Sequence, residues 1–322
     1  MKYSDIPFDQ MVKVGHRQYL KEDWFSVNWL FGRYCNYSCS YCWSYAHTKK
    51  KDFRRFSLMY ETLMAIFIEA GYNGYNKFAF SISGGEPTKH PDFIRILNCM
   101  FQRNSKVHIT TNCSNNINWF KKLKKHAHKL SITASFHPEF TSRKEFENKI
   151  KLLERMGIKT QINIVLVHDN FDEMYNHAIY FFDRGFVVQA KIQLDYINGD
   201  TFEKPYTKEQ LNKIKNSFVK EKKSYHIFKM IDKDGKEYYI DNLERLLGLN
   251  FNRYKDWICE AGYRSIIITE PSGDIKRHFM CKDKPLGNIT SGFKLYDKLK
   301  KCITEICGSS ADCKIPKYKE IE

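Results

Sequence analysis

The chain has 322 residues, and its content of 42% hydrophobic and 28% charged residues excludes wholesale disorder and suits one large domain with a smaller one. It has no apolar stretch near the roughly 18 residues of a membrane-spanning helix and no signal-peptide core, so we expect a cytoplasmic protein without membrane contact and with reduced cysteines. The formal net charge of +16 favours an anionic partner, although a lysine-rich composition that only raises solubility explains it equally well.

Residues 1–23 are polar and show no clear period, whereas strand and helix patterns alternate from residue 24 to 195. The predicted strands are 25–31, 77–83, 106–111, 129–135, 158–167 and 187–194. The predicted helices are 57–70, 91–103, 116–127, 142–156 and 171–184. Because repeated strand–helix units require parallel pairing and right-handed crossovers, the pattern predicts an α/β fold with ligands at the carboxyl ends of the strands.

Three cysteines follow the first predicted strand, in the run Cys35-Asn-Tyr-Ser-Cys39-Ser-Tyr41-Cys42. Soft thiolates in one short loop select an iron–sulfur cluster or zinc. Three ligands on a cluster of four irons would leave one iron open to bind a reactive molecule. Two alternatives remain, a structural zinc ion closed by His47 and buried, reduced thiols without a metal.

The second predicted strand ends in Gly84-Gly85-Glu86-Pro87. Glycines let the backbone approach a ligand closely, and the proline stiffens the exit from the turn. Alone this motif would more often be a simple turn. Together with the cysteine loop it resembles the radical S-adenosylmethionine (SAM) superfamily, which combines a Cys-x3-Cys-x-aromatic-Cys loop after the first barrel strand with Gly-Gly-Glu-Pro at the second.

The resemblance implies a partial (β/α)6 TIM-type barrel and assigns roles to the motif residues. The three loop cysteines would hold a [4Fe–4S] cluster, with the amino and carboxylate groups of SAM on the open iron. Tyr41 would pack by the adenine, and the turn of Gly84, Gly85, Glu86 and Pro87 would hold the methionyl ammonium. The resemblance implies further SAM contacts at later strand ends, from Thr111, Asn112 and Ser135, with Thr133 as a weaker candidate.

Other residues at the same rim are candidates with a structural alternative each. Cys113 stands where the family usually has glycine, and it would supply a hydrogen atom or thiyl radical unless it is a packed spectator thiol. His137 would donate a proton or bind an anion, or else be a hydrogen-bonded structural histidine. Asn163, Gln193 and Asp195 alternate with or flank inward positions on the fifth and sixth strands, and they are candidates for a polar pocket.

Five further cysteines surround a predicted hairpin (264–279) and a predicted amphipathic helix (291–301) near the C-terminus. They are Cys259, Cys281, Cys302, Cys307 and Cys313. This arrangement resembles the SPASM/twitch extension of radical SAM enzymes, and in its twitch form four cysteines hold one auxiliary [4Fe–4S] cluster. One of the last three cysteines would then be a spectator. A zinc ribbon is the structural alternative.

The expected organisation is an N-terminal extension (1–23), a radical SAM partial barrel (24–195), a connector with a helix and a hairpin (196–255), and a small hairpin-plus-helix iron–sulfur domain (256–322). The basic run from Lys121 to Lys129 is interpreted as the solvated face of a helix, and nucleic-acid binding there is not expected.

The hypothesis is an enzyme that cleaves SAM at a [4Fe–4S] cluster to a 5′-deoxyadenosyl radical and abstracts hydrogen from a substrate. The substrate is either an anionic metabolite such as a nucleotide sugar or a peptide, and an electron donor such as flavodoxin or ferredoxin is implied. The alternative is a non-catalytic metal-binding or nucleic-acid-binding module on the same barrel.

Overall fold

The computed structural model describes residues 6–16, 19–20, 24–42, 47–197, 200–216, 227–240, 251–307 and 310–320. The chain divides into two compact units. The terminal unit comprises Met1–Asn28, Glu61–Ala79 and Lys223–Glu322, and the parallel unit comprises Trp29–Tyr60 and Phe80–Lys222. This division does not follow the four predicted domains, whose boundaries stay a prediction.

All six predicted strands form, and the last four of them lie wholly in the parallel unit. The six strands are β2 (Trp24–Leu30), β3 (Lys77–Ser83), β4 (Asn104–Thr111), β5 (Leu130–Ser135), β6 (Lys159–Leu166) and β7 (Val188–Ile192), in that order across the sheet. The pairs β4–β5, β5–β6 and β6–β7 are parallel. The predicted α/β fold with a parallel sheet is therefore confirmed, and it is the arrangement expected of a partial (β/α)6 barrel.

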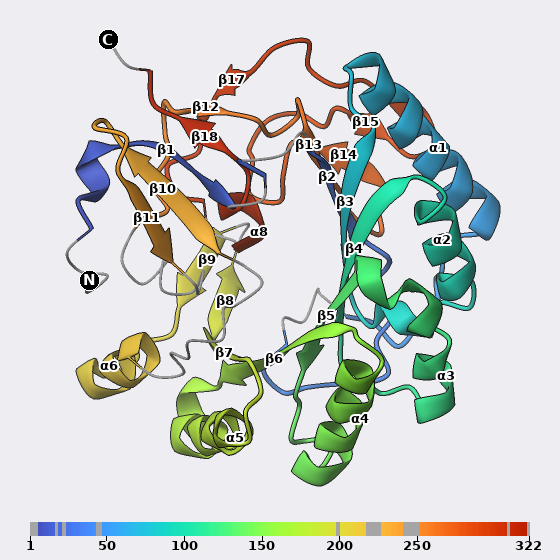
Figure 1. The fold of residues 1–322 in the computed structure, drawn as a ribbon, viewed down its shortest axis with the longest axis vertical. Helices are drawn as coiled ribbons and strands as arrows, with labels where there is room; N and C mark the ends of the chain where they lie inside the picture. The colour runs from blue at the N-terminus through green and yellow to red at the C-terminus, as the bar shows by residue number, and fades with distance from the viewer. Residues whose placement is uncertain are drawn as a thin grey trace. The chain divides into compact units, whose positions relative to one another are not determined.

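Five helices alternate with these strands, as the sequence predicts. They are α1 (Phe56–Tyr72), α2 (Phe93–Met100), α3 (Ile117–Lys121), α4 (Arg143–Arg155) and α5 (Phe171–Asp183). Short 3-10 helices lie at Pro87–Lys89 (η3), Lys124–Lys129 (η4) and His168–Asn170 (η5). Helices α2 to α5 lie along one face of the strands (Figure 1).

Local sequence signals explain where these helices begin and end. The Asn116 and Ser142 side chains accept hydrogen bonds from the third amide of α3 and α4, which satisfies donors that the first turn leaves unpaired. Gly157 and Gly185 follow α4 and α5 with φ angles of 82° and 91°, the left-handed conformation that favours glycine. After β7 the parallel unit continues through β8 (Leu194–Ile197), β9 (Asp200–Glu203) and α6 (Lys208–Asn216).

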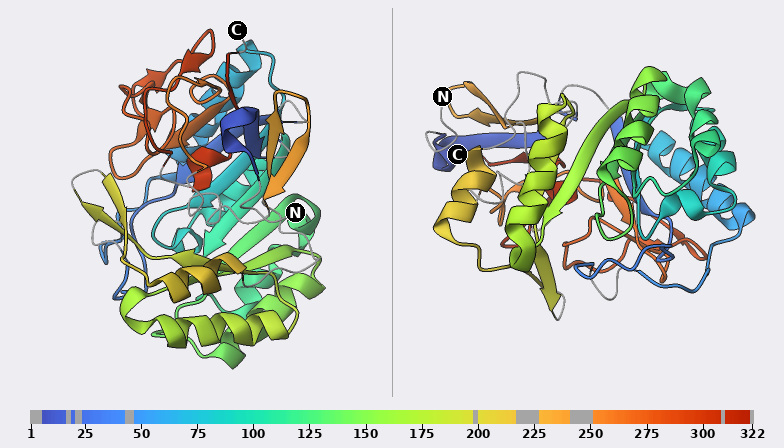
Figure 2. Two further views of the ribbon diagram at one scale, coloured as in Figure 1. Left: turned by 90° about the vertical axis from the view of Figure 1, so that its left-hand side faces the viewer. Right: turned by 90° about the horizontal axis from the view of Figure 1, so that it is seen from below.

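The terminal unit is antiparallel. Its six-stranded sheet has the order β11-β10-β1-β18-β12-β17, with β1 (Met11–His16), β10 (Phe228–Asp232), β11 (Glu237–Ile240), β12 (Ile258–Cys259), β17 (Lys300–Lys301) and β18 (Lys317–Tyr318). The hairpin predicted within the connector (196–255) is confirmed as β10–β11, and it lies beside β1 (Figure 2). The second predicted hairpin is confirmed as β13 (Ser265–Ile268) and β14 (Asp274–Lys276).

Two parts of the terminal unit differ from the predictions. Strand β1 (Met11–His16) lies within residues 1–23, where no element is predicted. Its sequence has no clear strand period, and the strand forms because it pairs with β10 and β18. The predicted helix at 291–301 is wrong. Strand β16 (Gly292–Phe293) pairs with β15 (Gly287–Asn288) there, and the next residues form irregular backbone.

Tertiary partners explain why no helix forms at 291–301. The Leu295 amide donates to Oε1 of Glu69 at 2.9 Å, and the Tyr296 amide donates to the Gly262 carbonyl at 2.9 Å. Amide groups engaged in this way are unavailable to an intrahelical ladder. The region between Cys281 and Cys302 is therefore held to the rest of the terminal unit by its backbone.

Candidate metal and cofactor site

The Gly84-Gly85 turn lies directly against the backbone that leads into the cysteine loop. The Gly85 amide donates to the Gly32 carbonyl at 2.9 Å, and the Glu86 amide donates to the Tyr34 carbonyl at 2.7 Å. A Cβ atom on Gly85 would lie 2.2 Å from the Tyr34 oxygen, and one on Gly84 would lie 2.5 Å from the Gly32 oxygen. Both glycines are therefore required by close backbone packing, which fixes the cysteine loop against the end of β3.

Glu86 joins the end of β3 to the end of β4. Its side chain is 1% exposed, and burial raises the pKa of the carboxyl above its usual value, although four hydrogen bonds oppose this shift. Oε1 accepts hydrogen bonds from the Thr88 amide at 3.0 Å and from the hydroxyls of Thr88 and Thr111, while Oε2 accepts one from the Asn112 amide at 2.6 Å. A carboxylate oxygen offers two acceptor positions, so Oε2 has capacity for one further donor.

His137 lies against the second half of the cysteine loop. Its Nδ1 is 3.2 Å from the Cys39 sulfur and 2.7 Å from the Tyr41 hydroxyl, and its ring stacks on the Tyr41 ring with centroids 5.9 Å apart. Burial lowers the pKa of His137 to about 4, so the imidazole is neutral at pH 7. Burial also raises the pKa of the Cys39 thiol to about 12. In this geometry His137 contacts the loop itself.

Cys35 is contacted from the end of β4. The Asn112 side-chain amide donates to the Cys35 sulfur at 3.8 Å and to the Asn36 side-chain oxygen at 3.2 Å. The next residue, Cys113, has a φ of 55°, a left-handed conformation that a non-glycine residue adopts only at some cost. Its side chain is 1% exposed, and burial raises the pKa of its thiol. Cys113 thus occupies the position where the radical SAM superfamily, which the sequence resembles, usually has glycine.

The remaining predicted site residues have structural partners in the parallel unit. Asn163 pairs in register with Ser135 across β5 and β6, and its side-chain oxygen accepts a hydrogen bond from Gln161 at 3.3 Å. The Gln193 side-chain oxygen accepts a hydrogen bond from the His168 amide at 2.8 Å, at the start of η5. Hence Asn163 lies in the same layer as Ser135, whereas Gln193 caps a neighbouring loop.

Two loop contacts were not foreseen from the sequence. The Glu139 carboxylate accepts hydrogen bonds from the Ser40 amide at 3.1 and 3.2 Å and from its hydroxyl at 2.8 Å. The Lys49 ammonium donates to the carbonyls of Tyr37 and Cys35 at 2.9 and 3.3 Å. The only sequence signal for Glu139 is its place two residues after His137 at the same strand end. Both residues hold the loop backbone in place.

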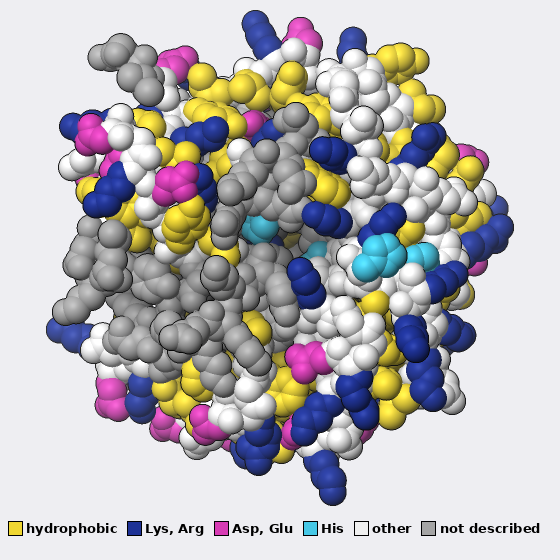
Figure 3. Space-filling view, viewed as in Figure 1, with side chains coloured by type: hydrophobic (Ala, Val, Ile, Leu, Met, Phe, Trp, Pro, Cys, Tyr) yellow, Lys and Arg dark blue, Asp and Glu magenta, His cyan; other side chains and the backbone are white. Residues whose placement is uncertain are grey.

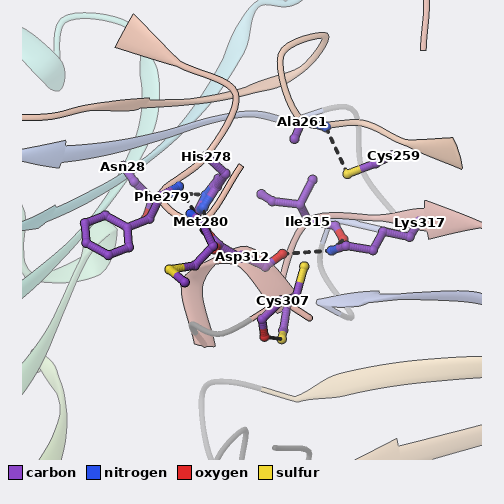
Figure 4. Close-up of polar contacts among 11 residues, drawn as sticks. Asn28, Cys259, Ala261, His278, Phe279, Met280, Cys307, Asp312, Ile315 and Lys317 are labelled. Carbon is purple, nitrogen blue, oxygen red and sulfur yellow. Dashed lines mark hydrogen bonds and ion pairs between the residues drawn. The ribbon is translucent and has the colours of Figure 1, made fainter. Parts of the chain in front are cut away.

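A second group of cysteines lines one cavity in the terminal unit, shown in part in Figure 4. Four of the five C-terminal cysteines contribute to its wall: Cys259, Cys281, Cys302 and Cys307. Cys313 is fully buried beside them and is absent from the wall, and its sulfur donates to the Cys307 carbonyl at 3.4 Å. A side-chain hydrogen bond with Cys313 lowers the pKa of Cys307 to about 6, against the effect of burial.

The same cavity is also lined by His278, Asp312 and Lys317. His278 is 1% exposed, and burial lowers its pKa to about 3, so the ring is neutral. Its Nδ1 pairs with the Asp312 carboxylate, and its Nε2 accepts a hydrogen bond from the Asn28 side-chain amide at 2.9 Å. Burial alone would lower the pKa of Lys317, but the neighbouring thiolates outweigh it and raise the pKa.

The spacing of the thiols bears on which metal group fits. Among the described residues, no three His, Cys, Asp or Glu side chains are gathered tightly enough to hold one metal ion. A zinc ion holds its cysteine sulfurs at about 2.3 Å, whereas a four-iron cluster attaches each cysteine to a different iron and is wider. A cluster and a zinc ion, including the zinc set closed by His47, both stay predictions for the two groups of cysteines.

The outer face of the parallel unit is basic. Lys and Arg side chains are frequent over α3 and α4 (Figure 3), and Lys121, Lys122, Lys124 and Lys125 are exposed. The predicted helix at 116–127 is divided into α3 and η4, so this run does not form one continuous basic helix. Separately, among the helices that the structure describes, none has the length and apolar character needed to cross a bilayer.

Comparisons with known proteins agree with the α/β fold described above. The sequence model of the radical SAM superfamily matches residues 29–181, and no curated protein sequence matches the chain. The solved structure of native anSMEcpe with bound AdoMet is similar with a TM-score of 0.56 at 15% identity, over 82% of this chain and 78% of that chain.

Two structures with bound peptides are also similar. Native anSMEcpe with bound AdoMet and Kp18Cys peptide has a TM-score of 0.55 at 16% identity, over 82% of this chain and 78% of that chain. Streptococcus suis SuiB bound to precursor peptide SuiA has a TM-score of 0.50 at 16% identity, over 82% of this chain and 62% of that chain. At these identities the likeness shows a shared fold.

Proposed function

Because this chain is an enzyme of the radical SAM superfamily, we propose that Cys35, Cys39 and Cys42 hold its [4Fe–4S] cluster and that the ends of β3, β4 and β5 hold SAM. The observation that carries the proposal is the packing of the glycine turn against the cysteine loop. The amides of Gly85 and Glu86 donate hydrogen bonds to the carbonyls of Gly32 and Tyr34, which lie just before Cys35. A cluster in the loop would therefore lie beside the turn assigned to the methionyl ammonium.

A [4Fe–4S] cluster held by Cys35, Cys39 and Cys42 would supply the electron for reductive cleavage of SAM, and this cleavage would provide the species that abstracts hydrogen from the substrate. The chain's own residues position these groups. Asn112 donates to the Cys35 sulfur, and neutral His137 is hydrogen-bonded to the Tyr41 hydroxyl through Nδ1 and packs on its ring. Glu86 holds two strand ends together and keeps acceptor capacity for an ammonium group.

The test is the uncoupled cleavage of SAM. Anaerobically reconstituted protein with dithionite and SAM should form 5′-deoxyadenosine, while a Cys35/Cys39/Cys42→Ala triple variant should form none. His137→Gln should retain the cluster and slow the reaction, because glutamine can still form a hydrogen bond with the Tyr41 hydroxyl but cannot stack on its ring. Absence of 5′-deoxyadenosine from the wild-type protein, with its cluster fully loaded, would overturn the proposed activity.

For the substrate we propose a peptide that is modified at a side chain or an α-carbon. Support comes from the similar folds of anSMEcpe with a bound peptide and of SuiB with its precursor peptide. An anionic metabolite is the second candidate, and the net charge of +16 favours it. An extract below 10 kDa from the source organism should stimulate 5′-deoxyadenosine formation. Loss of this stimulation after protease treatment indicates a peptide, and its survival indicates a metabolite.

We propose that the cavity in the terminal unit holds one auxiliary [4Fe–4S] cluster on the four cysteines of its wall, in the twitch manner. Cys313 is then the spectator, because it is absent from that wall and its sulfur contacts the Cys307 carbonyl. Cys313→Ala should keep about eight irons per chain, whereas Cys307→Ala should fall to about four. Equal losses in both variants would contradict this ligand set, and zinc in place of iron would favour the ribbon alternative.

A further inference from the structure

Lys317 is a buried cation in the wall of the cysteine cavity. Its side chain belongs to β18, and the residue is 1% exposed. The ammonium donates hydrogen bonds to the main-chain carbonyls of Asp312 and Ile315, both at 2.8 Å (Figure 4). It also lies 4.8 Å from the centroid of the Tyr254 ring. All three of these partners are neutral groups.

A buried ammonium with only neutral partners is unfavourable, because burial removes its hydration without supplying an opposite charge. Within the described ranges, none of the ion pairs joins Lys317 to a carboxylate. The Asp312 carboxylate faces other donors, namely His278 and the amides of Phe279 and Met280 at 3.2 and 3.0 Å. The compensating negative charge must therefore come largely from the cavity itself.

The cysteine cavity can provide that charge. Four thiolates around a [4Fe–4S] core in its 2+ state carry a net charge of −2, and uptake of one electron from a low-potential donor such as dithionite makes it −3. A fixed cation next to the cluster stabilises the more negative state more strongly. Net charge near a cluster is one of the factors that set its reduction potential.

We propose that Lys317 is the counter-cation of the auxiliary cluster and raises its reduction potential. Lys317 is a positioning residue in this scheme, since it tunes the cluster and takes no part in bond cleavage. The inference rests on the auxiliary cluster proposed above. It assigns a function to a lysine that carries no metal-binding signal in the sequence, since only its position four residues after Cys313 marks it.

The test uses the full chain with Cys35, Cys39 and Cys42 replaced by alanine, so that the auxiliary cluster gives the only iron–sulfur signal. In this background Lys317→Met removes the charge at similar length, and Lys317→Arg keeps it. Lys319→Met is the matched control, since Lys319 is exposed and its charge is screened by water. The potential is measured by a redox titration followed by electron paramagnetic resonance.

Lys317→Met should lower the ratio of reduced to oxidised cluster at fixed potential at least tenfold, which equals about 59 mV for a one-electron couple. Lys317→Arg and Lys319→Met should change this ratio less than threefold. An unchanged potential in Lys317→Met with four irons retained would overturn the inference and leave the auxiliary cluster standing.

Two outcomes of the iron analysis remain informative. If Lys317→Met loses its iron, retention of four irons by Lys317→Arg supports a charge effect, and loss of iron in both variants overturns it. If the background protein itself binds no iron, the auxiliary cluster is contradicted, and the inference falls with it.

Discussion

Replacement of Gly85 by alanine should damage the site through sterics alone. The added Cβ would lie 2.2 Å from the Tyr34 oxygen and 2.5 Å from the Arg33 oxygen, and both are backbone atoms that cannot rotate away. Overpacking of this kind typically costs about 1–3 kcal/mol. The amide hydrogen bonds of Gly85 and Glu86, at 2.9 and 2.7 Å, would also lengthen, and each contributes about 0.5–1.5 kcal/mol. We therefore expect a loss of about 2–6 kcal/mol in the free energy of unfolding.

Urea unfolding of anaerobically purified protein measures this loss, and iron analysis measures its effect on the cysteine loop. The matched control is Gly71→Ala in α1, where a Cβ meets no atom within 4 Å and alanine is favoured over glycine by up to about 1 kcal/mol. Gly85→Ala should also lose about four irons, because the loop that carries Cys35 shifts. Stability within about 0.5 kcal/mol of wild type, together with full iron content, would refute this reasoning.

Two further variants test buried polar groups of the parallel unit. Nδ1 of His90 accepts from the Asp92 amide at 3.1 Å and its Nε2 lies 3.0 Å from the Arg54 carbonyl, so the ring is neutral, and burial lowers its pKa. As the pH drops, the unfolded state takes up the proton first, so the free energy of unfolding should fall below about pH 6.5, by at most about 1.4 kcal/mol per pH unit. In urea unfolding at a series of pH values, His90→Gln should have a smaller slope. An unchanged slope would contradict a neutral, buried His90. Glu86→Gln should lower the free energy of unfolding by about 1–3 kcal/mol, since it places an amide group among donors from Thr88 and its neighbours. An unchanged free energy of unfolding in the same assay would argue against a tightly held carboxylate.

The alternating part of the chain could be predicted closely because its signals are local. Strand β3 has the predicted bounds, and α5 ends one residue before its prediction. Glycine after α4 and α5 marks each helix end through its backbone conformation. Strand β1 could not be predicted in this way, because its partners β10 and β18 lie more than 200 residues further along the chain.

The sequence could predict which residues form the candidate site, but it could predict less well how their atoms contact one another. The spacing of Cys35, Cys39 and Cys42 and the glycine turn point to the same strand ends that the structure brings together. Sequence could not show that the two glycines serve contact with the loop backbone, or that Gln193 caps η5. Such roles depend on which atoms approach in three dimensions, and one residue type serves several of them.

The same limit applies to the C-terminal cysteines. Spacing alone leaves Cys302, Cys307 and Cys313 equivalent, whereas in the structure the first two line a cavity and the third does not. The chain contains 53 Lys and Arg residues, and burial is what distinguishes Lys317 among them. A buried charge is a property of the fold, and a linear sequence carries little trace of it.

The most direct test of the central claim is the iron and sulfide content of anaerobically purified protein, with electron paramagnetic resonance, beside the Cys35/Cys39/Cys42→Ala triple variant. We predict about eight irons per wild-type chain and about four in the variant, as two [4Fe–4S] clusters require. Iron that is equal in both proteins, or zinc in place of iron, would contradict a SAM-cleaving cluster in the loop after β2.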